Sequence, residues 1–323
     1  MKHDADHGYS STPPRVGSLA AARAKLDLDT NGLGSHRSKL AALLLVVAAS
    51  FLGVVLLTGP DAVAETLTPI PQVSTSANTG EKPQSKVWFN AGSWWAVFSS
   101  NSVSPSGSWL WRLEPDNTWK NVLHLSSDLA ARADTKPVGN VTHILLYSTV
   151  PRLVSVEYVP SGNTYQLWPV RPTATALSLP LDSETAAIDI DSTGRMWLAT
   201  DSSTTVPVYY SDPPYSSFAG PIALANNITI DDISDVATLP NGTVGVLWSN
   251  QNTERFGFKV HVDGDPPGNW SGDEVPASRS AQNVGFGMAD DHISLAVASD
   301  STLYAAVKTS YNTSGYPRVS LLV

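Results

Sequence analysis

The chain has 323 residues, of which 42% are hydrophobic, with ten Trp, ten Tyr, no Cys and a formal net charge of −9. The absence of Cys excludes disulfide bonds and thiolate metal sites. The acidic balance argues against a nucleic-acid partner, because phosphate binding requires clustered Lys and Arg.

The first 85 residues are predicted to precede the folded domain. Residues 1–38 are rich in Ser, Gly, Pro and charged residues without an apolar period, which predicts a disordered cytoplasmic leader. Residues 39–58 are predicted to form a transmembrane or signal-anchor helix, because residues 40–57 carry no charge and are about long enough to cross a bilayer. Basic residues precede this run, so the leader should stay in the cytoplasm and the rest of the chain should lie outside. Residues 59–85 are Thr-, Ser- and Pro-rich and are typical of a linker.

A second outcome for this segment is removal of the leader. The sequence Ala62-Val63-Ala64 has the small-x-small form of a signal-peptidase site. Cleavage near Ala64 would release a secreted protein, whereas a retained helix would leave a single-pass membrane protein with its C-terminal domain outside. A buried soluble helix is the third alternative.

From residue 86 onward, short apolar runs alternate with turn residues, which is the pattern of an all-β domain. An acidic step occurs twice, as Asp231-Asp232-Ile233-Ser234 and as Asp290-Asp291-His292-Ile293-Ser294, and each copy leads into a hairpin. Units of this kind that recur about every 40–50 residues are typical of β-propeller blades. We therefore predict a single β-propeller of five to six blades over residues 86–323. The last apparent strand, residues 318–323, either closes the ring or marks a C-terminal truncation.

Acidic residues near the blade openings are the sharpest candidates for a site. They are Asp134, Glu184, Asp231, Asp232, Asp290 and Asp291, with His292 beside the last pair. If they occupy equivalent places, they form a ring at the mouth of the channel, where repelling carboxylates would favour Ca²⁺, a cationic ligand or a polyhydroxylated ligand. The alternative is that each carboxylate accepts backbone N–H groups and fixes a loop. A third hypothesis is a catalytic pair.

Two further sequence features bear on function. The sequon Asn-x-Ser/Thr, which is a glycosylation candidate in a secreted chain, occurs at Asn140, Asn227, Asn241, Asn269 and Asn312. The Trp-rich first unit, residues 88–111, favours either an aromatic blade core or an exposed surface that stacks on sugar rings.

Four segments carry a resemblance to a known family: Asp191-Ser192-Thr193-Gly194-Arg195-Met196-Trp197, and residues 244–250, 288–293 and 303–309. With these segments, residues 184–323 resemble the sialidase-like, or neuraminidase-like, propeller proteins found outside bacterial cells. The resemblance implies an extracellular propeller that handles glycans. In the Asp-box of that family, Ser-x-Asp-x-Gly-x-Thr-Trp, the Asp and Gly are one residue closer than Asp191 and Gly194.

No catalytic residue of the family can be assigned in this chain. We therefore expect a non-catalytic module, extracellular or at the cell surface, that binds a glycan or protein ligand. The alternative is a sialidase-like glycoside hydrolase that uses carboxylates at the channel mouth.

Overall fold

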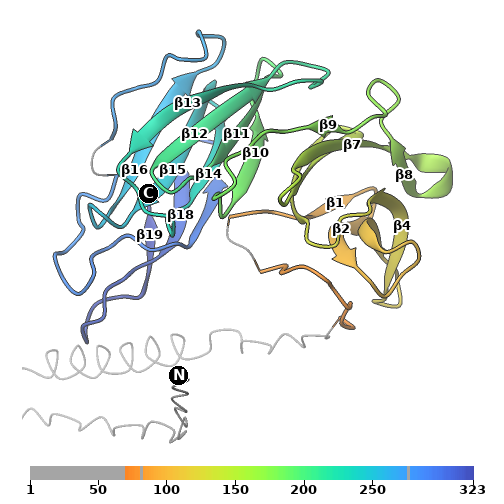
Figure 1. Cartoon of the computed structure of the whole chain (residues 1–323), viewed down its shortest axis with the longest axis horizontal. Coiled ribbons are helices and arrows are strands. Elements are labelled where there is room, and N and C mark those ends of the chain that lie inside the picture. The colour runs from red at the N-terminus through yellow and green to blue at the C-terminus, as the bar shows by residue number, and fades with distance from the viewer. Residues whose placement is uncertain (1–69, 81–82, 275–276) are drawn as a thin grey trace, which may run out of the picture. The chain divides into compact units, whose positions relative to one another are not determined.

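Antiparallel β-strands make up nearly all the regular structure of the described part of this protein. The computed structural model describes residues 70–80, 83–274 and 277–323. Its strands form five separate sheets in chain order, and a single turn of 3-10 helix, η1 (Pro160–Gly162), is the one helical element in this described part (Figure 1). The described residues therefore contain five sheets, where the sequence predicts five to six blades.

The first three sheets each contain four consecutive strands, which pair in chain order. The first is built from β1 (Val87–Asn90), β2 (Ser93–Ser100), β3 (Gly107–Leu113) and β4 (Trp119–Ser126). The second is built from β5 (Arg132–Val138), β6 (Val141–Tyr147), β7 (Arg152–Val159) and β8 (Thr164–Leu167), and the short β9 (Thr175–Ala176) also pairs with β7. The third is built from β10 (Ala186–Ile190), β11 (Met196–Thr200), β12 (Thr205–Ser211) and β13 (Ala219–Asn226).

The fourth and fifth sheets contain three strands each. The fourth is built from β14 (Ser234–Leu239), β15 (Thr243–Asn250) and β16 (Arg255–Val262). The fifth is built from β17 (Ile293–Val297), β18 (Leu303–Lys308) and β19 (Val319–Leu322). Each repeated acidic step therefore precedes the first strand of a sheet, as the sequence predicts.

Tight turns join the first two strands of a sheet. Between β1 and β2, Ala91 and Gly92 have φ values of 49° and 79°. Two consecutive residues with positive φ are the signature of a type I′ turn, whose twist matches that of a two-stranded ribbon. Gly92 fits this position because it lacks a Cβ. The turn sets the register of the β1–β2 pair, in which Asn90 lies opposite Ser93.

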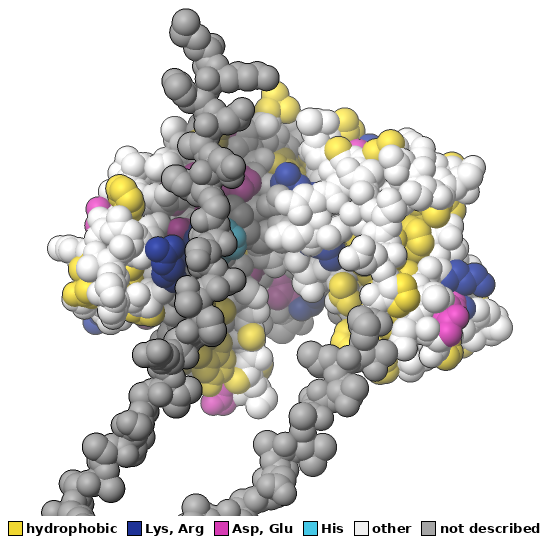
Figure 2. Space-filling view, turned by 90° about the horizontal axis from the view of Figure 1, so that it is seen from below, with side chains coloured by type: hydrophobic (Ala, Val, Ile, Leu, Met, Phe, Trp, Pro, Cys, Tyr) yellow, Lys and Arg dark blue, Asp and Glu magenta, His cyan; other side chains and the backbone are white. Residues whose placement is uncertain are grey.

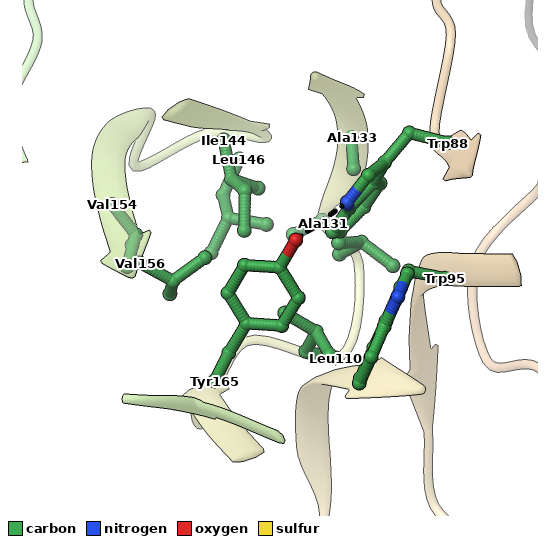
Figure 3. Close-up of a cluster of buried hydrophobic side chains, with 11 residues drawn as sticks. Trp88, Trp95, Leu110, Ala131, Ala133, Ile144, Leu146, Val154, Val156 and Tyr165 are labelled. Atoms are coloured by element: carbon green, nitrogen blue, oxygen red, sulfur yellow. Dashed lines mark hydrogen bonds between the residues drawn. The ribbon is translucent and has the colours of Figure 1, made fainter. Parts of the chain in front are cut away.

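Apolar side chains fill the space between neighbouring sheets. One buried cluster joins the first and second sheets, and its edge-to-face contact between Trp95 and Tyr165 has a centroid distance of 4.8 Å (Figure 3). In the same cluster the Trp88 Nε1–H donates to the Tyr165 hydroxyl at 3.0 Å. Three similar clusters join the second sheet to the third, the third to the fourth and the fourth to the fifth. Among the described residues, no such cluster joins the fifth sheet to the first.

The first strands of the sheets surround a central channel. A cavity of about 290 Å³ is lined by parts of β5, β10, β14 and β17 and by Pro83 and Ser85, which precede β1. Successive sheets that pack face to face around a shared cavity, with the first strands of the second to fifth sheets beside it, have the architecture of a β-propeller. On the face drawn in Figure 2, charged side chains are few and scattered, and at the right-hand edge a basic and an acidic group lie side by side.

The predicted leader, membrane helix and most of the linker lie outside the described residues. Within the described part of the chain, no helix is long and apolar enough to span a membrane. All described residues belong to one unit, Thr68–Val323.

Candidate functional site

Three carboxylates from three successive sheets meet at one end of the channel. Glu184, Asp231 and Asp291 lie in the segments that lead into β10, β14 and β17, and one side-chain oxygen of each lies within 4.8 Å of the other two. These strands are the first of their sheets and all border the channel, so the residues just before them lie at its rim. We call these three residues the acidic mouth.

Hydrogen bonds and ion pairs hold the acidic mouth in place. Gln251 Nε2 donates to Asp231 Oδ2 at 3.1 Å. The imidazole Nδ1 of His292 lies 2.6 Å from Asp291 Oδ1, and Lys308 Nζ lies 3.6 Å from the same oxygen. The guanidinium of Arg132 donates to the backbone oxygen of Glu184 at 2.9 Å. Positive and polar groups therefore surround the three carboxylates.

Asp290 belongs to an adjoining group with Asp291 and His292, whose ligand atoms also lie within 4.8 Å of one another. Lys308 Nζ lies 2.9 Å from Asp290 Oδ1, and Ser310 Oγ donates to Asp290 Oδ2 at 2.8 Å. The hydrogen bond to Asp290 raises the pKa of Lys308 above its ordinary value. Asp290 thus acts as the counterion of Lys308 at the edge of the acidic mouth.

Asp232, the neighbour of Asp231, has a different environment. Its side chain is fully buried, and its carboxylate accepts the backbone N–H of Thr229 at 2.7 Å and that of Gln251 at 3.0 Å. These bonds fix the loop before β14, which is the structural alternative considered from the sequence. Asp232 does not join the acidic mouth.

Asp134 lies inside the channel and not at its rim. It is buried, and its two oxygens accept the backbone N–H groups of Ser85 at 2.6 Å and Ile188 at 2.8 Å. Burial raises the pKa of Asp134 to about 7, against the opposing effect of these hydrogen bonds. Asp134 therefore links the first three sheets and is separate from the acidic mouth.

Two further channel aspartates were not among the sequence candidates. Asp189 in β10 accepts the backbone N–H of Thr238 in β14 at 2.7 Å, and it forms an ion pair with Lys136. Asp235 in β14 is buried, and burial raises its pKa well above the ordinary value. Each is a lone Asp inside an apolar first strand, and this was the sequence signal that could have revealed them.

A pocket of about 250 Å³ adjoins the acidic mouth. Two of its lining residues are next to Glu184: Arg132 donates to the Glu184 backbone oxygen, and Ser183 precedes Glu184 in the chain. The other walls include Tyr147, Ser148, Thr149, Pro151 and Leu179–Leu181. The Tyr147 hydroxyl donates to the backbone oxygen of Ser183, and burial raises the pKa of Tyr147 to about 12. The pocket therefore offers hydroxyl and guanidinium groups beside apolar walls.

The remaining sequence candidates have surface or structural positions. Asp191 accepts the backbone N–H of Thr193 and Arg195 and the indole N–H of Trp197, so it holds the β10–β11 hairpin. In the Trp-rich first unit, Trp88, Trp95 and Trp111 are buried, while Trp94 is 49% exposed. All five sequon asparagines, Asn140, Asn227, Asn241, Asn269 and Asn312, are exposed.

No protein-family model and no curated protein matches the chain. Among solved structures, a Trypanosoma rangeli sialidase in complex with the inhibitor DANA is 12% identical, with 75% of this chain and 47% of that chain covered at a TM-score of 0.48. A Bacteroides ovatus protein described as xyloglucan PUL GH43B is also 12% identical, covering 75% and 52% at a TM-score of 0.38. An exo-beta-1,3-galactanase from Phanerochaete chrysosporium is 12% identical, covering 72% and 58% at a TM-score of 0.38. The chain spans about half the length of the first two, and the propeller architecture rests on its own sheets and channel.

Proposed function

We propose that this propeller is a non-catalytic module that binds a glycan or a similar polyhydroxylated surface ligand at the acidic mouth. The observation that carries the proposal is the convergence of Glu184, Asp231 and Asp291 from three separate sheets to within 4.8 Å. A carboxylate that only fixes a loop does not need to approach carboxylates of other sheets. Asp232 is an example, because it accepts N–H groups from Thr229 in its own loop and from Gln251 just after β15.

The chemistry of the site suits hydroxyl groups. Ionised carboxylates are acceptors only, and each sugar ring presents several O–H donors. The adjoining pocket of about 250 Å³ is smaller than the roughly 300–1,000 Å³ of pockets that enclose drug-sized ligands. It therefore suits one sugar residue or a group of similar size, with Arg132 and Tyr147 in its wall.

Glycoside hydrolysis is the second candidate function. A glycosidase places two carboxyl groups on opposite sides of the bond that breaks, about 5–5.5 Å apart in retaining enzymes and about 6.5–9.5 Å apart in inverting ones. In this chain three carboxylates converge on one point, which favours shared contact with one bound group. The binding role is therefore the simpler account of the geometry.

The uncharged run of residues 40–57 supports presentation of the module at a membrane surface. In this proposal the propeller lies outside the cell, either anchored or released by cleavage near Ala64. Its ligand would then be a glycan of a neighbouring surface.

A glycan array probed with the full-length protein tests the proposal. We expect the wild type to bind at least one class of glycan. The double variant Asp231→Asn/Asp291→Asn should lose at least about ten-fold in signal, because each substitution removes a negative charge and replaces one acceptor oxygen with an NH₂ donor. The control is Asp300→Asn, since Asp300 is exposed in the β17–β18 turn, where its side chain bonds to Thr302.

Three readouts decide the result. The melting temperature of the double variant should stay within a few degrees of the wild type, so that lost binding is not lost folding. Equal signal from the wild type and the double variant would contradict the proposed site. Cleavage of the bound glycan by the wild type would favour the hydrolase instead.

A further inference from the structure

Another cavity, of about 360 Å³, lies between the fourth and fifth sheets. Half-buried apolar side chains line it from both sheets: Leu239, Phe258 and Val260 from the fourth, and Leu303 and Leu322 from the fifth. The buried side chains of Leu247 and Ala305 also line it, and both belong to the apolar cluster that joins these two sheets. The cavity therefore continues the core between the sheets out to the solvent.

This cavity lies at the opposite end of the two sheets from the acidic mouth. Asp231 and Asp291 precede β14 and β17, whereas the cavity is lined by Asn241 and Ser301, which lie in the turns that follow these strands. A ligand bound here would leave the acidic mouth free. The inference drawn from this cavity is therefore independent of the proposed function.

Small residues keep this space open. Gly245 lies two residues from Leu247 in β15 and so shares its face of the sheet. A Cβ at Gly245 would lie 2.7 Å from the Phe258 ring, so the ring lies over this glycine and forms a wall of the cavity. On the facing sheet, Ala305 has only a methyl group to fill the space. Interiors leave few voids larger than a water molecule, whereas small-molecule sites have volumes of roughly 300–1,000 Å³.

Glu274 is the one ionisable side chain among the lining residues. Its backbone N–H donates to the backbone oxygen of Phe258 at 2.8 Å, which fixes this residue beside the aromatic wall. Arg279 lines an adjoining cavity together with Glu274, but within the described residues Glu274 forms no ion pair. An ionised carboxylate beside an apolar space is complementary to a ligand with an apolar body and one cationic group.

We propose that this cavity binds a small hydrophobic amine, whose apolar body packs against Phe258 and Leu303 and whose ammonium group pairs with Glu274. An ammonium group has three N–H donors. The hydroxyl oxygens of Thr243 and Thr302, which also line the cavity, can accept hydrogen bonds from the donors that Glu274 leaves free. A neutral ligand of the same shape would gain only the apolar contacts.

Isothermal calorimetry of the full-length protein with two matched probes tests the site. 2-Phenylethylamine is cationic at neutral pH, and 2-phenylethanol has the same size but no charge. Titration with each probe to about 10 mM detects Kd values near 1 mM. We expect the wild type to bind one amine per chain about three- to five-fold more tightly than the alcohol, as for a partly exposed ion pair.

Variants assign the binding to the carboxylate and to the cavity. Glu274→Gln should bind the two probes with equal affinity, because it removes the charge and keeps the apolar walls. Glu157→Gln is the matched control: it removes one charge in β7, outside this cavity, and should keep the preference for the amine. Ala305→Leu should weaken the binding of both probes at least about ten-fold, because the longer side chain occupies the cavity. If Ala305→Leu does not fold, Leu303→Ala replaces it and should weaken both probes at least about three-fold, because an apolar wall is lost.

Each outcome supports or overturns the inference. No binding of either probe by the wild type overturns it. Equal affinity of the wild type for the two probes, or a preference for the amine that persists in Glu274→Gln, overturns the ion pair. Unchanged affinity in Ala305→Leu, or in Leu303→Ala where that variant replaces it, places the binding elsewhere and overturns the site. No glycan enters this experiment, so its failure leaves the proposed function standing.

Discussion

At the scale of single residues, the aspartates of the channel connect one sheet to the next. Asp134 accepts N–H groups from Ser85 and Ile188, and Asp189 accepts that of Thr238. Each bond joins segments from different sheets, which apolar packing alone would leave free to slide. A buried carboxylate that accepts backbone N–H groups is stabilised by them, yet burial still disfavours its charge.

Asp134 predicts a dependence of stability on pH. Its pKa is about 7 in the folded protein, against about 3.9 in an unfolded chain. The folded state therefore retains the proton more strongly, so the contribution of Asp134 is fully present below about pH 4 and is lost as the pH rises through about 7. From pH 5 to pH 8 we expect this carboxyl to lower the free energy of unfolding by on the order of 3 kcal/mol.

Urea denaturation at pH 5 and pH 8 measures this effect. The wild type should be more stable at pH 5, and Asp134→Asn, which cannot titrate, should show a smaller difference between the two pH values. Asp235 is raised in pKa mainly by burial and in part by the charge of Asp134, so Asp134→Asn also reduces the contribution of Asp235 to the pH dependence. An identical pH dependence in the two proteins would show that Asp134 is not the titrating group.

The sequence could indicate acidic residues at the blade openings but not which of two neighbours forms the site. Asp231 and Asp232 are adjacent and chemically identical, yet one is exposed at the mouth and the other is fully buried in its loop. That difference depends on the conformation of the loop, which no periodic pattern encodes.

At the scale of elements, the outer edge of β16 shows how the fourth sheet ends with three strands. The backbone N–H groups of Phe258 and Val260 donate to Asp273 Oδ1 and Ser271 Oγ, in place of the carbonyl groups of a fourth strand. These side chains cover an edge that would otherwise be open to pairing with another chain. The backbone N–H groups of Ser271 and Glu274 in turn donate to the carbonyl oxygens of Val260 and Phe258, so residues 271–274 cover this edge without forming a regular strand.

The pairing of β15 with β16 requires a residue without a side chain at position 257. Gly257 lies opposite Trp248, and a Cβ at Gly257 would approach the Trp248 ring to 2.2 Å. Trp248 is fully packed in the cluster between the third and fourth sheets and cannot move without disturbing it. We expect Gly257→Ala to lower the free energy of unfolding by about 2–3 kcal/mol.

Chemical denaturation of Gly257→Ala and of the control Gly268→Ala measures this effect. A Cβ at Gly268 meets no atom within 4 Å, so its substitution should change the stability by no more than about 0.5 kcal/mol. Equal stability of the two variants would mean that Trp248 does not pack against Gly257 as described.

At the scale of the whole molecule, packing between successive sheets builds the channel and brings its rim residues together. The repeat of hairpins was predicted from the sequence, because alternating apolar residues and turn residues are local signals. β13 was not expected, since its Ala, Gly and Pro residues are weak strand formers. The sequence predicted a ring of acidic residues at the channel mouth. Which of these residues come together, namely Glu184, Asp231 and Asp291, depends on how the sheets pack.

The acidic mouth and the pocket beside it are where we expect the ligand to bind on this molecule. A crystal structure of the protein with the glycan that binds most strongly on the array locates the ligand directly. We predict hydroxyls of the glycan within hydrogen-bond distance of the carboxylates of Glu184, Asp231 and Asp291, and a sugar residue in the pocket beside Tyr147. A glycan bound elsewhere, for example on the exposed pair Phe89 and Trp94, with the mouth occupied only by water, would contradict the central claim.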